Sequence, residues 1–437
     1  MKENLIGRIN VKDAVVGVVG LGYVGLPLAV ELASAGYKVV GVDVKEAVVA
    51  GVNRGKSHVG DVPSTRLEPL VEQGLIRATA DYADLGSADC ISICVPTPLN
   101  KSKDPDISYF TGAVDRILEH LAPGKLVVLE STTYPGTTEE LIAARIERER
   151  GLEVGRQVFV AFSPERVDPG NKAFNTRNTP KVLGGVTPAC TEVARALYSA
   201  VVERVHCVGS AREAETVKLL ENTFRAVNIA LVNEFLLMCN RMDIDVWNVI
   251  EAAATKPFGF MPFFPGPGIG GHCIPLDPMY MSWKAKAVDF YNRFIELATD
   301  INGNMPRFVV QRLADLLNER ERSLKGSRIM VLGMAYKKNV DDLRESPGLE
   351  LYRLLRQKGA WVEFHDPHAR SFVSVLGNIV ESSPIDDGRL ATFDAAVLAT
   401  DHDAFDYPRI AREAQLILDC RDAFARHGVA GGSVVKL

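Results

Sequence analysis

The sequence predicts an α/β protein in which two domains with parallel sheets, each covered by helices on both faces, are joined by a central all-helical domain with a long linking helix. Two observations predict this fold. Short β-branched runs alternate with helical stretches in the N-terminal half and again in the C-terminal third. Between them, residues 210–242 show helical periodicity only. The 437 residues suffice for two or three domains, which we place at 1–208, 209–307 and 308–437.

The first predicted strand, helix and second strand form a dinucleotide-binding unit of the Rossmann type. VVGVVG (15–20) is the apolar, β-branched run of a buried parallel strand. GLGYVG then supplies G-x-G-x-x-G, whose glycines allow a tight turn and let a pyrophosphate approach the N-terminus of the next helix. The residues of this loop expected at the cofactor are Gly20, Gly22, Tyr23, Val24 and Gly25.

The second predicted strand, YKVVGVD, ends at Asp43. An acid at this position can accept hydrogen bonds from both ribose hydroxyls of the adenosine, so Asp43 favours NAD over NADP. Lys45 is a nearby cation that would work against this preference. Strand, glycine fingerprint, helix, strand and acid follow in the order that dinucleotide binding requires, and NAD is therefore the predicted cofactor.

Three later strands of the N-terminal half end in polar turns. The first ends in a Pro-Thr-Pro turn at Thr97, and the second in a Ser/Thr turn at Thr132. The third delivers Glu165 and Arg166. Because the carboxyl ends of parallel strands share the edge where open α/β sheets bind ligands, both threonines are candidates to touch the nicotinamide end of the cofactor. Their local sequence fits turn and capping hydroxyls equally well.

Residues 210–242 predict one long helix with an apolar stripe. The stripe consists of Val217, Leu220, Phe224, Val227, Leu231, Phe235 and Met238. A helix of this length commonly links two domains or forms a subunit interface. Lys218 and Asn222 stand one turn apart beside the stripe and share a face. Such a pair can donate hydrogen bonds to a developing oxyanion, or it can be a solvated face.

The segment GPGIGGHCIPLD (266–277) places a cysteine in a glycine-rich loop. Its glycines, Gly270 among them, remove side chains where a substrate or cofactor must approach, and they permit positive φ. Cys273 lies in this loop and Asp277 follows four residues later. In a dinucleotide-binding chain this pattern suggests covalent catalysis, because a cysteine adduct of an aldehyde can lose a hydride and leave a thioester. The alternative is a buried structural cysteine beside a tight turn.

The C-terminal third predicts a second Rossmann-type domain. SRIMVLGMAYK, AWVEFHD and FDAAVLATDH read as strands that end in polar loops. The first turn lacks the G-x-G-x-x-G spacing, so a nucleotide other than a dinucleotide is expected there. RESP predicts a helix start with Ser346 as N-cap and Pro347 at the first helical position.

Composition argues against several other classes. A net charge of −5 offers no reason to expect nucleic acid or an anionic membrane as a partner. Residues 14–30 carry no charge, but their glycines and Pro27 fit a phosphate loop rather than a membrane span. Seven cysteines without a pairing pattern predict reduced thiols and a cytoplasmic enzyme. The histidines show no convincing metal spacing, and HDPH (365–368), the nearest approach, is expected to be a solvated turn, so no metal is predicted.

These motifs together resemble the UDP-glucose/GDP-mannose dehydrogenase family along nearly the whole chain. The matching elements stand in the family's order: GLGYVGLP, PTP, EST, SPER, Lys218-x-x-x-Asn222, GIGGHCIPLD and GMAYKKNVDDLRESP. The resemblance implies a four-electron oxidation of the C6 alcohol of a nucleotide sugar to a carboxylate, with two NAD per turnover. It also implies a helical dimerising middle domain, a C-terminal domain that binds the UDP-sugar, a homodimer or higher homo-oligomer, and a product used in surface polysaccharides.

The resemblance assigns roles to the candidate catalytic residues. Cys273 would be the nucleophile that holds the aldehyde and then the thioester. Lys218 and Asn222 would stabilise oxyanions. Asp277 with Glu165 would manage protons and the hydrolytic water, and the sequence leaves open which of them is the base.

Further residues follow from the same match. Thr132 would position the water or the cofactor, and Lys337 and Arg344 would reach from the C-terminal domain to the substrate and the cofactor. The residues expected at the substrate are Glu165, Arg166, Lys218, Asn222, Gly270 and Lys337.

Two features bear on the sugar. Family members that act on UDP-glucose commonly have an aromatic residue after the cysteine and NPEF in place of SPER, whereas here Ile274 follows Cys273 and the segment reads SPERVDPGN. These features resemble the branch that oxidises UDP-N-acetylhexosamines. UDP-N-acetylglucosamine is the expected substrate, with UDP-N-acetylmannosamine and UDP-glucose as alternatives. A two-electron hydroxy-acid dehydrogenase and a catalytically silent NAD-binding protein are more remote alternatives, since neither needs the cysteine loop.

Overall fold

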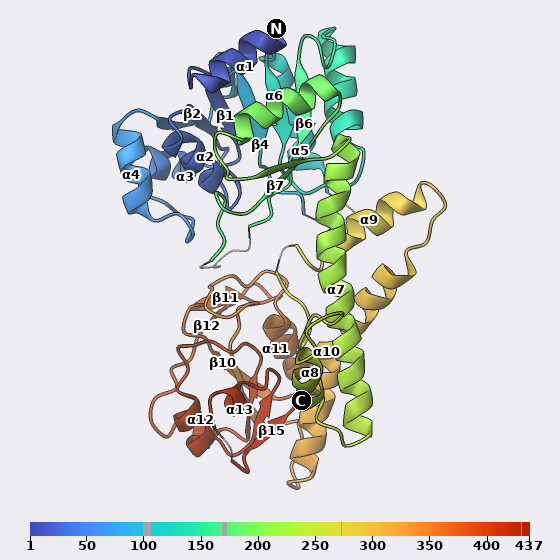
Figure 1. Cartoon of the computed structure of the whole chain (residues 1–437). Coiled ribbons are helices and arrows are strands. Elements are labelled where there is room, and N and C mark those ends of the chain that lie inside the picture. The colour runs from blue at the N-terminus through green and yellow to red at the C-terminus, as the bar shows by residue number, and fades with distance from the viewer. Residues whose placement is uncertain (99–105, 168–172, 272, 430) are drawn as a thin grey trace. The chain divides into compact units, whose positions relative to one another are not determined.

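The chain forms two compact units (Figure 1). The computed structural model describes residues 1–98, 106–167, 173–271, 273–429 and 431–437. The N-terminal unit comprises Met1–Glu221 and Met279–Asp289, and the C-terminal unit comprises Asn222–Pro278 and Phe290–Leu437. This division differs from the three domains expected from the sequence, and their boundaries stay a prediction.

The N-terminal unit is built on one large, mostly parallel sheet. Its strands are β1 (Val15–Val19), β2 (Lys38–Val42), β3 (Ile76–Thr79), β4 (Cys90–Ile93), β5 (Leu126–Leu129), β6 (Phe159–Phe162), β7 (Lys181–Gly185) and β8 (Val205–Cys207). The order is β3-β2-β1-β4-β5-β6-β7-β8, and β6 pairs antiparallel with β7. Because the chain leaves β1 to one side for β2 and later returns on its other side for β4, the carboxyl end of β1 is a topological switch point, where open α/β sheets bind ligands.

Helices cover both faces of this sheet. They are α1 (Lys2–Asn10), α2 (Gly25–Ser34), α3 (Glu46–Asn53), α4 (Ser64–Glu72), η1 (Tyr82–Ser87), α5 (Ser108–Glu119), η2 (Thr138–Ala143), η3 (Ile146–Arg150) and α6 (Pro188–Tyr198). One apolar core joins α1, α2 and α6 to the sheet, and a second joins α5 and η2 to it. The alternation of a strand is visible in β1, where Val16 and Val18 enter the first core and Val19 the second.

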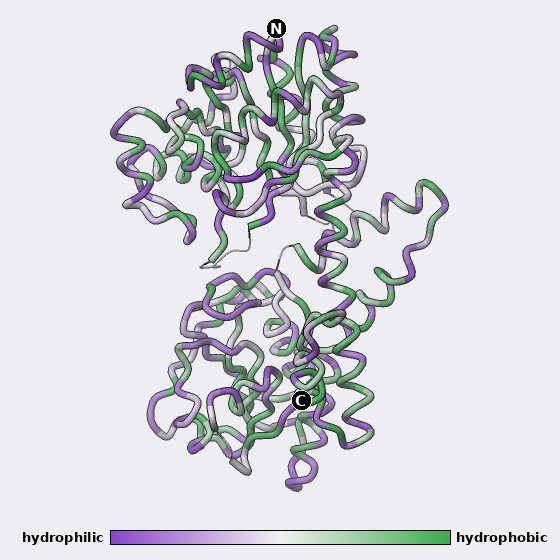
Figure 2. Tube along the Cα trace, in the orientation of Figure 1, coloured by the Kyte–Doolittle hydropathy of each residue, from purple (hydrophilic) through white to green (hydrophobic). Residues whose placement is uncertain are grey.

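The long helix α7 (Ala211–Arg241) has 31 residues, close to the predicted range. The apolar stripe predicted along it is largely exposed, since five of its side chains are 45% to 65% exposed: Leu220, Phe224, Leu231, Phe235 and Met238. From Val217 onward the buried positions lie on another side: Leu219, Asn222, Ala226, Ala230, Asn233, Leu236 and Cys239. Polar and apolar segments accordingly alternate along α7 in Figure 2. The apolar periodicity of this helix marks a surface of the chain rather than its core.

The C-terminal unit holds a second parallel sheet. Its strands are β9 (Arg328–Leu332), β10 (Trp361–His365), β13 (Ala395–Leu398), β14 (Ile417–Asp419) and β15 (Val434–Lys436), and β11 (Ser371–Val373) and β12 (Ile379–Glu381) form a separate antiparallel hairpin. The order of the parallel sheet is β10-β9-β13-β14-β15. β9 thus lies between β10 and β13 as β1 lies between β2 and β4, so the two sheets start with the same arrangement.

Helices also cover both faces of the second sheet. They are α8 (Val246–Ala254), α10 (Arg293–Asn318), α11 (Pro347–Gln357), η4 (Leu390–Thr392), α12 (Tyr407–Glu413) and α13 (Ala423–Arg426). The helix α9 (Asp277–Lys286) begins in this unit and runs on into the N-terminal unit. One core joins α8, α10 and α11 to the sheet, and another joins α12 and α13 to it. The predicted class, two Rossmann-like sheets with a central helical part, is confirmed.

The RESP segment starts α11 as predicted. The Ser346 hydroxyl oxygen accepts the N–H of Gly348 at 3.1 Å, and Pro347 is the first helical residue. The same hydroxyl donates to the carbonyl of Met334 at 2.7 Å. This cap therefore ties the start of α11 to the turn that follows β9.

Candidate active site

The G-x-G-x-x-G loop after β1 has the backbone that the sequence predicts. Gly20 has φ +89°, and a Cβ there would lie 2.7 Å from the Cys94 carbonyl oxygen. A Cβ at Gly25 would lie 1.8 Å from the carbonyl oxygen of Gly20, so only glycine lets α2 start this close to β1. At Gly22 a Cβ would meet no atom of the described residues within 4 Å. The loop is therefore packed at its two ends and open at Gly22, as a pyrophosphate cradle requires.

Asp43 follows β2 and contacts this loop. Its carboxylate oxygens accept the N–H of Leu21 at 2.9 Å and the N–H of Lys45 at 2.9 Å. Both hydrogen bonds come from backbone groups, so each oxygen keeps a further lone pair for a ribose hydroxyl. The half-buried acid, the glycine loop beside it and the open face at Gly22 fit the adenosine half of NAD.

This geometry predicts strong discrimination between the two dinucleotides. The carboxylate of Asp43 repels the 2′-phosphate of NADP, so kcat/KM for NAD should exceed that for NADP by about 10²-fold or more. Steady-state kinetics with both cofactors measure the ratio. Asp43→Asn should reduce it, and Lys38→Ala serves as the matched control because this exposed lysine lies at the opposite end of β2. Comparable values in the unmodified enzyme would show the assignment of Asp43 to be wrong and would point to Lys45.

Thr97 and Thr132 lie together at the carboxyl edge of the sheet. The Thr97 hydroxyl donates to the carbonyl of Thr132 at 2.7 Å, which joins the turn after β4 to the turn after β5. Tyr280 of α9 donates from its hydroxyl to the carbonyl of Thr97 at 2.9 Å. The two threonines predicted at the nicotinamide end are thus neighbours. The Thr97 hydroxyl holds the turns after β4 and β5 together at this edge of the sheet.

Glu165 and Arg166 follow β6 at the same edge but make different contacts. One carboxylate oxygen of Glu165 accepts the N–H groups of Arg166 and Val167, both at 2.8 Å. The guanidinium of Arg166 lies 2.6 Å from the carboxylate of Glu221 and donates to the Pro180 carbonyl at 2.6 Å. Arg166 is therefore held by an acid of α7, and the contact with substrate expected from the sequence stays a prediction.

A buried charge cluster stands behind Glu165. Lys181 lies 2.7 Å from the carboxylate of Glu130 and 3.8 Å from that of Glu165. The Tyr198 hydroxyl hydrogen-bonds to Glu130. Burial raises the pKa of Glu130. Burial alone would lower the pKa of Lys181, but the two carboxylates outweigh it and raise that pKa.

Sequence reasoning missed this cluster. Glu130 is the first residue of the EST motif, but Lys181 stands on β7, far along the chain. Only the antiparallel pairing of β7 with β6 brings the lysine to the strand end that carries Glu165.

Glu215 on α7 is a second residue that the sequence did not single out. Its carboxylate accepts the N–H of Gly136 at 2.5 Å and both the N–H and the hydroxyl of Thr138, at 2.9 Å and 2.7 Å. It therefore holds the turn that follows Thr132. Burial raises the pKa of Glu215 to about 7, although these hydrogen bonds oppose the shift. The sequence feature that could have identified Glu215 is its position on the same helix as Lys218, three residues earlier.

The raised pKa of Glu215 predicts a pH-dependent stability. In the unfolded chain this carboxyl group loses its proton near pH 4.5, the ordinary pKa of a glutamate, whereas the folded chain keeps the proton until about pH 7. The folded state therefore binds more protons between these values, and the contribution of Glu215 to stability is lost as pH rises through 7. The difference is at most about 3 kcal/mol. Thermal unfolding at pH 5 to 8 should show a smaller decline for Glu215→Gln than for the unmodified chain, and equal slopes would contradict the prediction.

Lys218 and Asn222 differ in their surroundings. Asn222 is buried, with 6% of its surface exposed, and its amide donates to the carboxylate of Asp277 at 2.5 Å. The solvated-face interpretation is therefore wrong for Asn222. Lys218 is half-buried, one turn earlier on α7. Asp277 is itself buried and is the first residue of α9.

The cysteine loop, residues 266–277, ends in a helical turn. The N–H of Asp277 donates to the carbonyl of Cys273 at 2.8 Å, so the thiol and the carboxylate stand one turn apart. Cys273 is partly exposed, whereas five of the seven cysteines are buried. The interpretation as a buried structural cysteine does not fit this exposure.

The glycines of the loop pack against the segment that follows β9. A Cβ at Gly270 would lie 2.7 Å from the Tyr336 side chain and 2.8 Å from the Glu345 carbonyl oxygen. The N–H of Gly271 donates to the carbonyl of Arg344 at 2.9 Å. Gly270 therefore serves close backbone packing. The same contacts bring the cysteine loop against the segment 336–347, which carries both Lys337 and Arg344.

The second sheet has an acid at the position that corresponds to Asp43 in the first sheet, but the side chain of this acid is buried. Asp366 follows β10 and accepts the N–H groups of Met334 and Ala335, at 2.6 Å and 2.9 Å. Its carboxylate also pairs with His402 at 3.0 Å, and both side chains are fully buried. Burial alone would raise the pKa of Asp366, but these hydrogen bonds lower it below its ordinary range. An adenosine ribose has no access to this acid, which agrees with the absence of a dinucleotide fingerprint here.

The same contacts correct the expectation for HDPH. We expected a solvated turn, but only Pro367 and His368 are exposed, while His365 is half-buried and Asp366 is buried. The other nitrogen of His402 accepts the N–H of Asn339 at 2.9 Å. Asp366 and His402 thus hold the turn that carries Lys337. Across the residues that could be described, no cluster of acids, cysteines and histidines could hold a metal ion.

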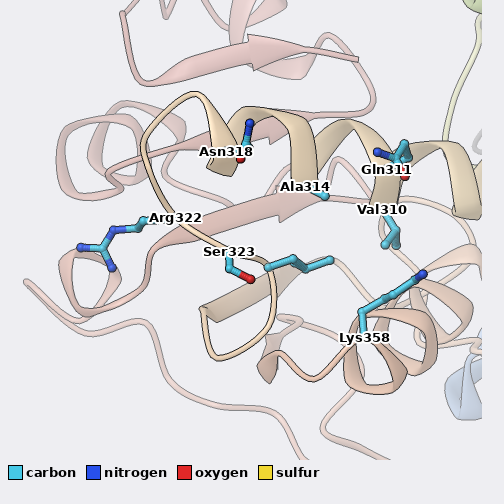
Figure 3. Close-up of a pocket in the computed structure, with 8 residues that line it drawn as sticks. Val310, Gln311, Ala314, Asn318, Arg322, Ser323 and Lys358 are labelled. Carbon is cyan, nitrogen blue, oxygen red and sulfur yellow. The ribbon is translucent and has the colours of Figure 1, made fainter.

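Two parts of the predicted site lie outside the described residues. They are residues 168–171 of SPERVDPGN and His272 of the cysteine loop. A cavity of about 330 Å³ lies near the end of α10, with Gln311, Arg322 and Lys358 in its lining (Figure 3). None of the predicted site residues lines this cavity.

Three family descriptions match successive parts of the chain. The NAD binding domain of the UDP-glucose/GDP-mannose dehydrogenase family matches residues 14–202, its central domain residues 212–304 and its UDP binding domain residues 330–426. The first match agrees with the glycine loop and Asp43. The third agrees with the second sheet, where Asp366 is buried and cannot bind a ribose.

Relatives match over most of the chain. The UDP-N-acetyl-D-mannosamine dehydrogenase of Pyrococcus horikoshii is 38% identical over 391 residues, which are 89% of this chain and 90% of that protein. A solved structure of the UDP-D-ManNAc dehydrogenase from this organism has a TM-score of 0.87 at 34% identity, covering 97% of this chain and 98% of the other.

Two further relatives carry other substrate names. The UDP-N-acetyl-D-glucosamine 6-dehydrogenase of Pseudomonas aeruginosa is 35% identical over 397 residues, which are 90% of this chain and 92% of that protein. A UDP-glucose dehydrogenase structure from Pyrobaculum islandicum has a TM-score of 0.84 at 30% identity, covering 97% and 98% of the two chains. With all three domain descriptions matched in order, the chain belongs to the UDP-glucose/GDP-mannose dehydrogenase family and is an NAD-dependent nucleotide-sugar dehydrogenase.

Proposed function

We propose that this enzyme oxidises the C6 hydroxyl of a UDP-N-acetylhexosamine to a carboxylate, with Cys273 as a covalent nucleophile. The observation that carries the proposal is the group formed by Cys273, Asp277 and Asn222 in the C-terminal unit. Asp277 lies one helical turn after the partly exposed cysteine, and its carboxylate accepts the Asn222 amide at 2.5 Å. A nucleophile and a carboxylate one turn apart are thus joined to an oxyanion donor of α7.

The first oxidation converts the C6 alcohol to an aldehyde. NAD supplies the hydride acceptor in both oxidations. Asp277 or Glu165 takes the proton of the C6 hydroxyl as the carbonyl forms. The thiolate of Cys273 then bonds to the aldehyde carbon, and the carbonyl oxygen becomes the oxygen of a thiohemiacetal. Lys218 and Asn222 donate to this oxygen where its negative charge develops.

The second oxidation and hydrolysis release the acid. The oxyanion of the thiohemiacetal loses a hydride from C6, which leaves a neutral thioester on Cys273. Water attacks the thioester carbon, the C–S bond breaks, and the thiolate leaves with the carboxylic acid formed. Glu165 or Asp277 takes the proton of this water, which Thr132 helps to position. Lys337 and Arg344, from the segment that packs on the cysteine loop, hold the substrate and the cofactor.

The N-acetylhexosamine assignment rests on sequence features and on relatives. Ile274 after the cysteine leaves more room in the pocket than an aromatic residue would. Relatives named for UDP-N-acetyl-D-mannosamine and UDP-N-acetyl-D-glucosamine match about 90% of the chain. We keep UDP-N-acetylglucosamine as the expected substrate. Its C2 epimer, UDP-N-acetylmannosamine, is the second candidate because the relative at 38% identity carries that name.

A substrate panel tests the reaction and the sugar together. We expect two NADH per sugar consumed. We also expect kcat/KM for UDP-N-acetylglucosamine to exceed that for UDP-glucose by more than about 10²-fold. A site that hydrogen-bonds the N-acetyl amide keeps unpaired polar groups when UDP-glucose, which has a hydroxyl there, is bound. The measurement counts NADH and compares UDP-glucose, UDP-N-acetylglucosamine and UDP-N-acetylmannosamine. One NADH per sugar would indicate a two-electron enzyme. A preference for UDP-glucose would reject the branch assignment, and a preference for the mannosamine epimer would reject only the stereochemistry at C2.

We also propose a homodimer built on the exposed stripe of α7. Phe224, Leu231, Phe235 and Met238 form a row of large apolar side chains along one helix, with about half of each surface exposed. A second copy would cover the stripe symmetrically, as the commonest homo-oligomers do. Sedimentation equilibrium that yields only the monomer mass of 47.7 kDa would contradict this proposal.

A further inference from the structure

A second buried asparagine of α7 contacts the cysteine loop. Asn233 lies 11 residues after Asn222, which is about three helical turns, and it has 0% of its surface exposed. Its side-chain oxygen accepts the N–H of Gly266 at 3.0 Å. Gly266 begins the cysteine loop and Asp277 ends it, so α7 holds the loop at both ends, through Asn233 and through Asn222.

Asn233 is in turn held by an asparagine of α10. The Asn233 amide nitrogen donates to the side-chain oxygen of Asn302 at 2.9 Å. The Asn302 amide nitrogen donates to the backbone carbonyl of Ala226, on α7, at 3.0 Å. A chain of three hydrogen bonds therefore runs from Gly266 through two buried side-chain amides back to α7.

This chain has only one possible direction. The Ala226 carbonyl can only accept and the Gly266 N–H can only donate, so each amide between them must donate on one side and accept on the other. Rotating either amide by half a turn would place two donors or two acceptors face to face inside the unit. The two ends therefore determine how both asparagines are oriented, and Asn302 keeps the Asn233 oxygen aimed at the loop.

The loop also lies against the same turn of α10. Gly268 has φ +131°, and a Cβ there would lie 3.3 Å from the backbone oxygen of Asn302 and 3.5 Å from the ring of Pro306. Pro306 has no N–H to donate to the carbonyl of Asn302 four residues earlier, so this carbonyl lacks its usual partner within the helix where the loop packs. Asn302 thus contacts the loop through its backbone and orients Asn233 through its side chain.

We propose that Asn233 and Asn302 are positioning residues for Cys273, which set the start of the cysteine loop relative to α7. The proposal rests on the proposed role of Cys273 as nucleophile. A thiol that must reach an aldehyde carbon tolerates little displacement, since a shift of about 1 Å can cost about 10²-fold in rate. Asn222 alone holds one end of a loop of twelve residues, rich in glycine, and the thiol between the two ends is placed only when both are held.

The test separates the first oxidation from the steps that need the thiol. In Asn233→Ala we expect the first NADH per site to form at nearly the normal rate in rapid mixing, while steady-state turnover falls about 10²-fold. Asn302→Ala should show the same pattern with a smaller loss, about 10-fold, because Asn233 remains to accept the Gly266 N–H. Asn240→Ala is the matched control, since this exposed asparagine of α7 donates to the Leu236 carbonyl within its own helix.

Two measurements distinguish mispositioning from poor folding. NAD affinity should stay close to that of Asn240→Ala, because the glycine loop and Asp43 belong to the N-terminal unit. The thermal midpoint should fall only modestly, since the variant leaves one buried N–H unpaired. The rate at which iodoacetamide modifies Cys273, followed by peptide mass spectrometry, should change in Asn233→Ala and not in Asn240→Ala.

The outcomes separate this inference from the proposed function. If Asn233→Ala slows both oxidations in proportion, or behaves as Asn240→Ala does, Asn233 is not a positioning residue and the inference is wrong. If Cys273→Ser retains full turnover, the proposed function fails instead, whatever Asn233 does. Loss of NAD binding together with a large fall in thermal midpoint in both Asn233→Ala and Asn302→Ala would assign the asparagines a purely structural role and overturn the inference.

Discussion

Cys273→Ser should abolish acid production while leaving NAD and the UDP-sugar bound. A serine hydroxyl is a poorer nucleophile toward the aldehyde than a thiolate, and its ester is hydrolysed less readily than a thioester, so steady-state turnover should fall by about 10³-fold or more. The first oxidation does not need the thiol, so the variant should still form up to one NADH per site. Rapid-mixing absorbance for NADH and calorimetry for ligand binding measure the two effects.

Cys207→Ser is the matched control for this variant. Cys207 is also partly exposed, but it lies on β8 of the N-terminal unit and outside the cysteine loop. It should retain normal turnover. Acid production at the full rate by Cys273→Ser would reject covalent catalysis, and loss of ligand binding in that variant would show that the cysteine serves the structure of the loop.

Lys218→Ala should lower kcat by about 10²-fold or more, with a smaller change in KM. The ammonium group is proposed to donate to an oxygen whose negative charge develops only in the transition state, so its removal raises the barrier more than it weakens binding. The measurement is steady-state kinetics with NAD and the UDP-sugar. Asn222→Ala should also lower kcat, and because Asp277 would then lose its amide partner the two variants need not have equal effects.

Arg212→Ala is the control for the loss of a cation from α7. Arg212 pairs with Glu139 at 2.7 Å and its side chain is 56% exposed. An exposed ion pair of this kind contributes little, so the variant should behave normally. A change confined to KM in Lys218→Ala would indicate that the lysine binds substrate and takes no part in stabilising the oxyanion.

Much of the fold could be predicted from local sequence. The strand at residues 15–19, the glycine loop after it and the cap at Ser346 can each be recognised from residue types within a few positions, and the structure has each of them. The glycine fingerprint and Asp43 could be linked in advance because one β-α-β unit brings them together by a known crossover.

The side of α7 that packs could not be predicted in this way. Apolar periodicity shows that a helix has an apolar face, but not what covers that face. In the structure the row with Phe224 and Leu231 is exposed, while Asn222 and Asn233 face the interior. A rule that assigns apolar side chains to the core does not find the buried side of α7, because the buried asparagines hydrogen-bond to the cysteine loop and so offset the cost of their burial.

By itself the sequence determined the chemistry available to this protein: a thiol in a glycine loop, an acid at the end of the second strand, and a lysine and an asparagine one turn apart. Each depends on residue type and near spacing. The tertiary structure alone decided which groups meet across long separations, including Lys181 with Glu165, Asp366 with His402, and the paired asparagines with Gly266. The physical reason is that a buried polar group must find its partner wherever strand order and helix packing place one, and no local pattern in the chain records that place.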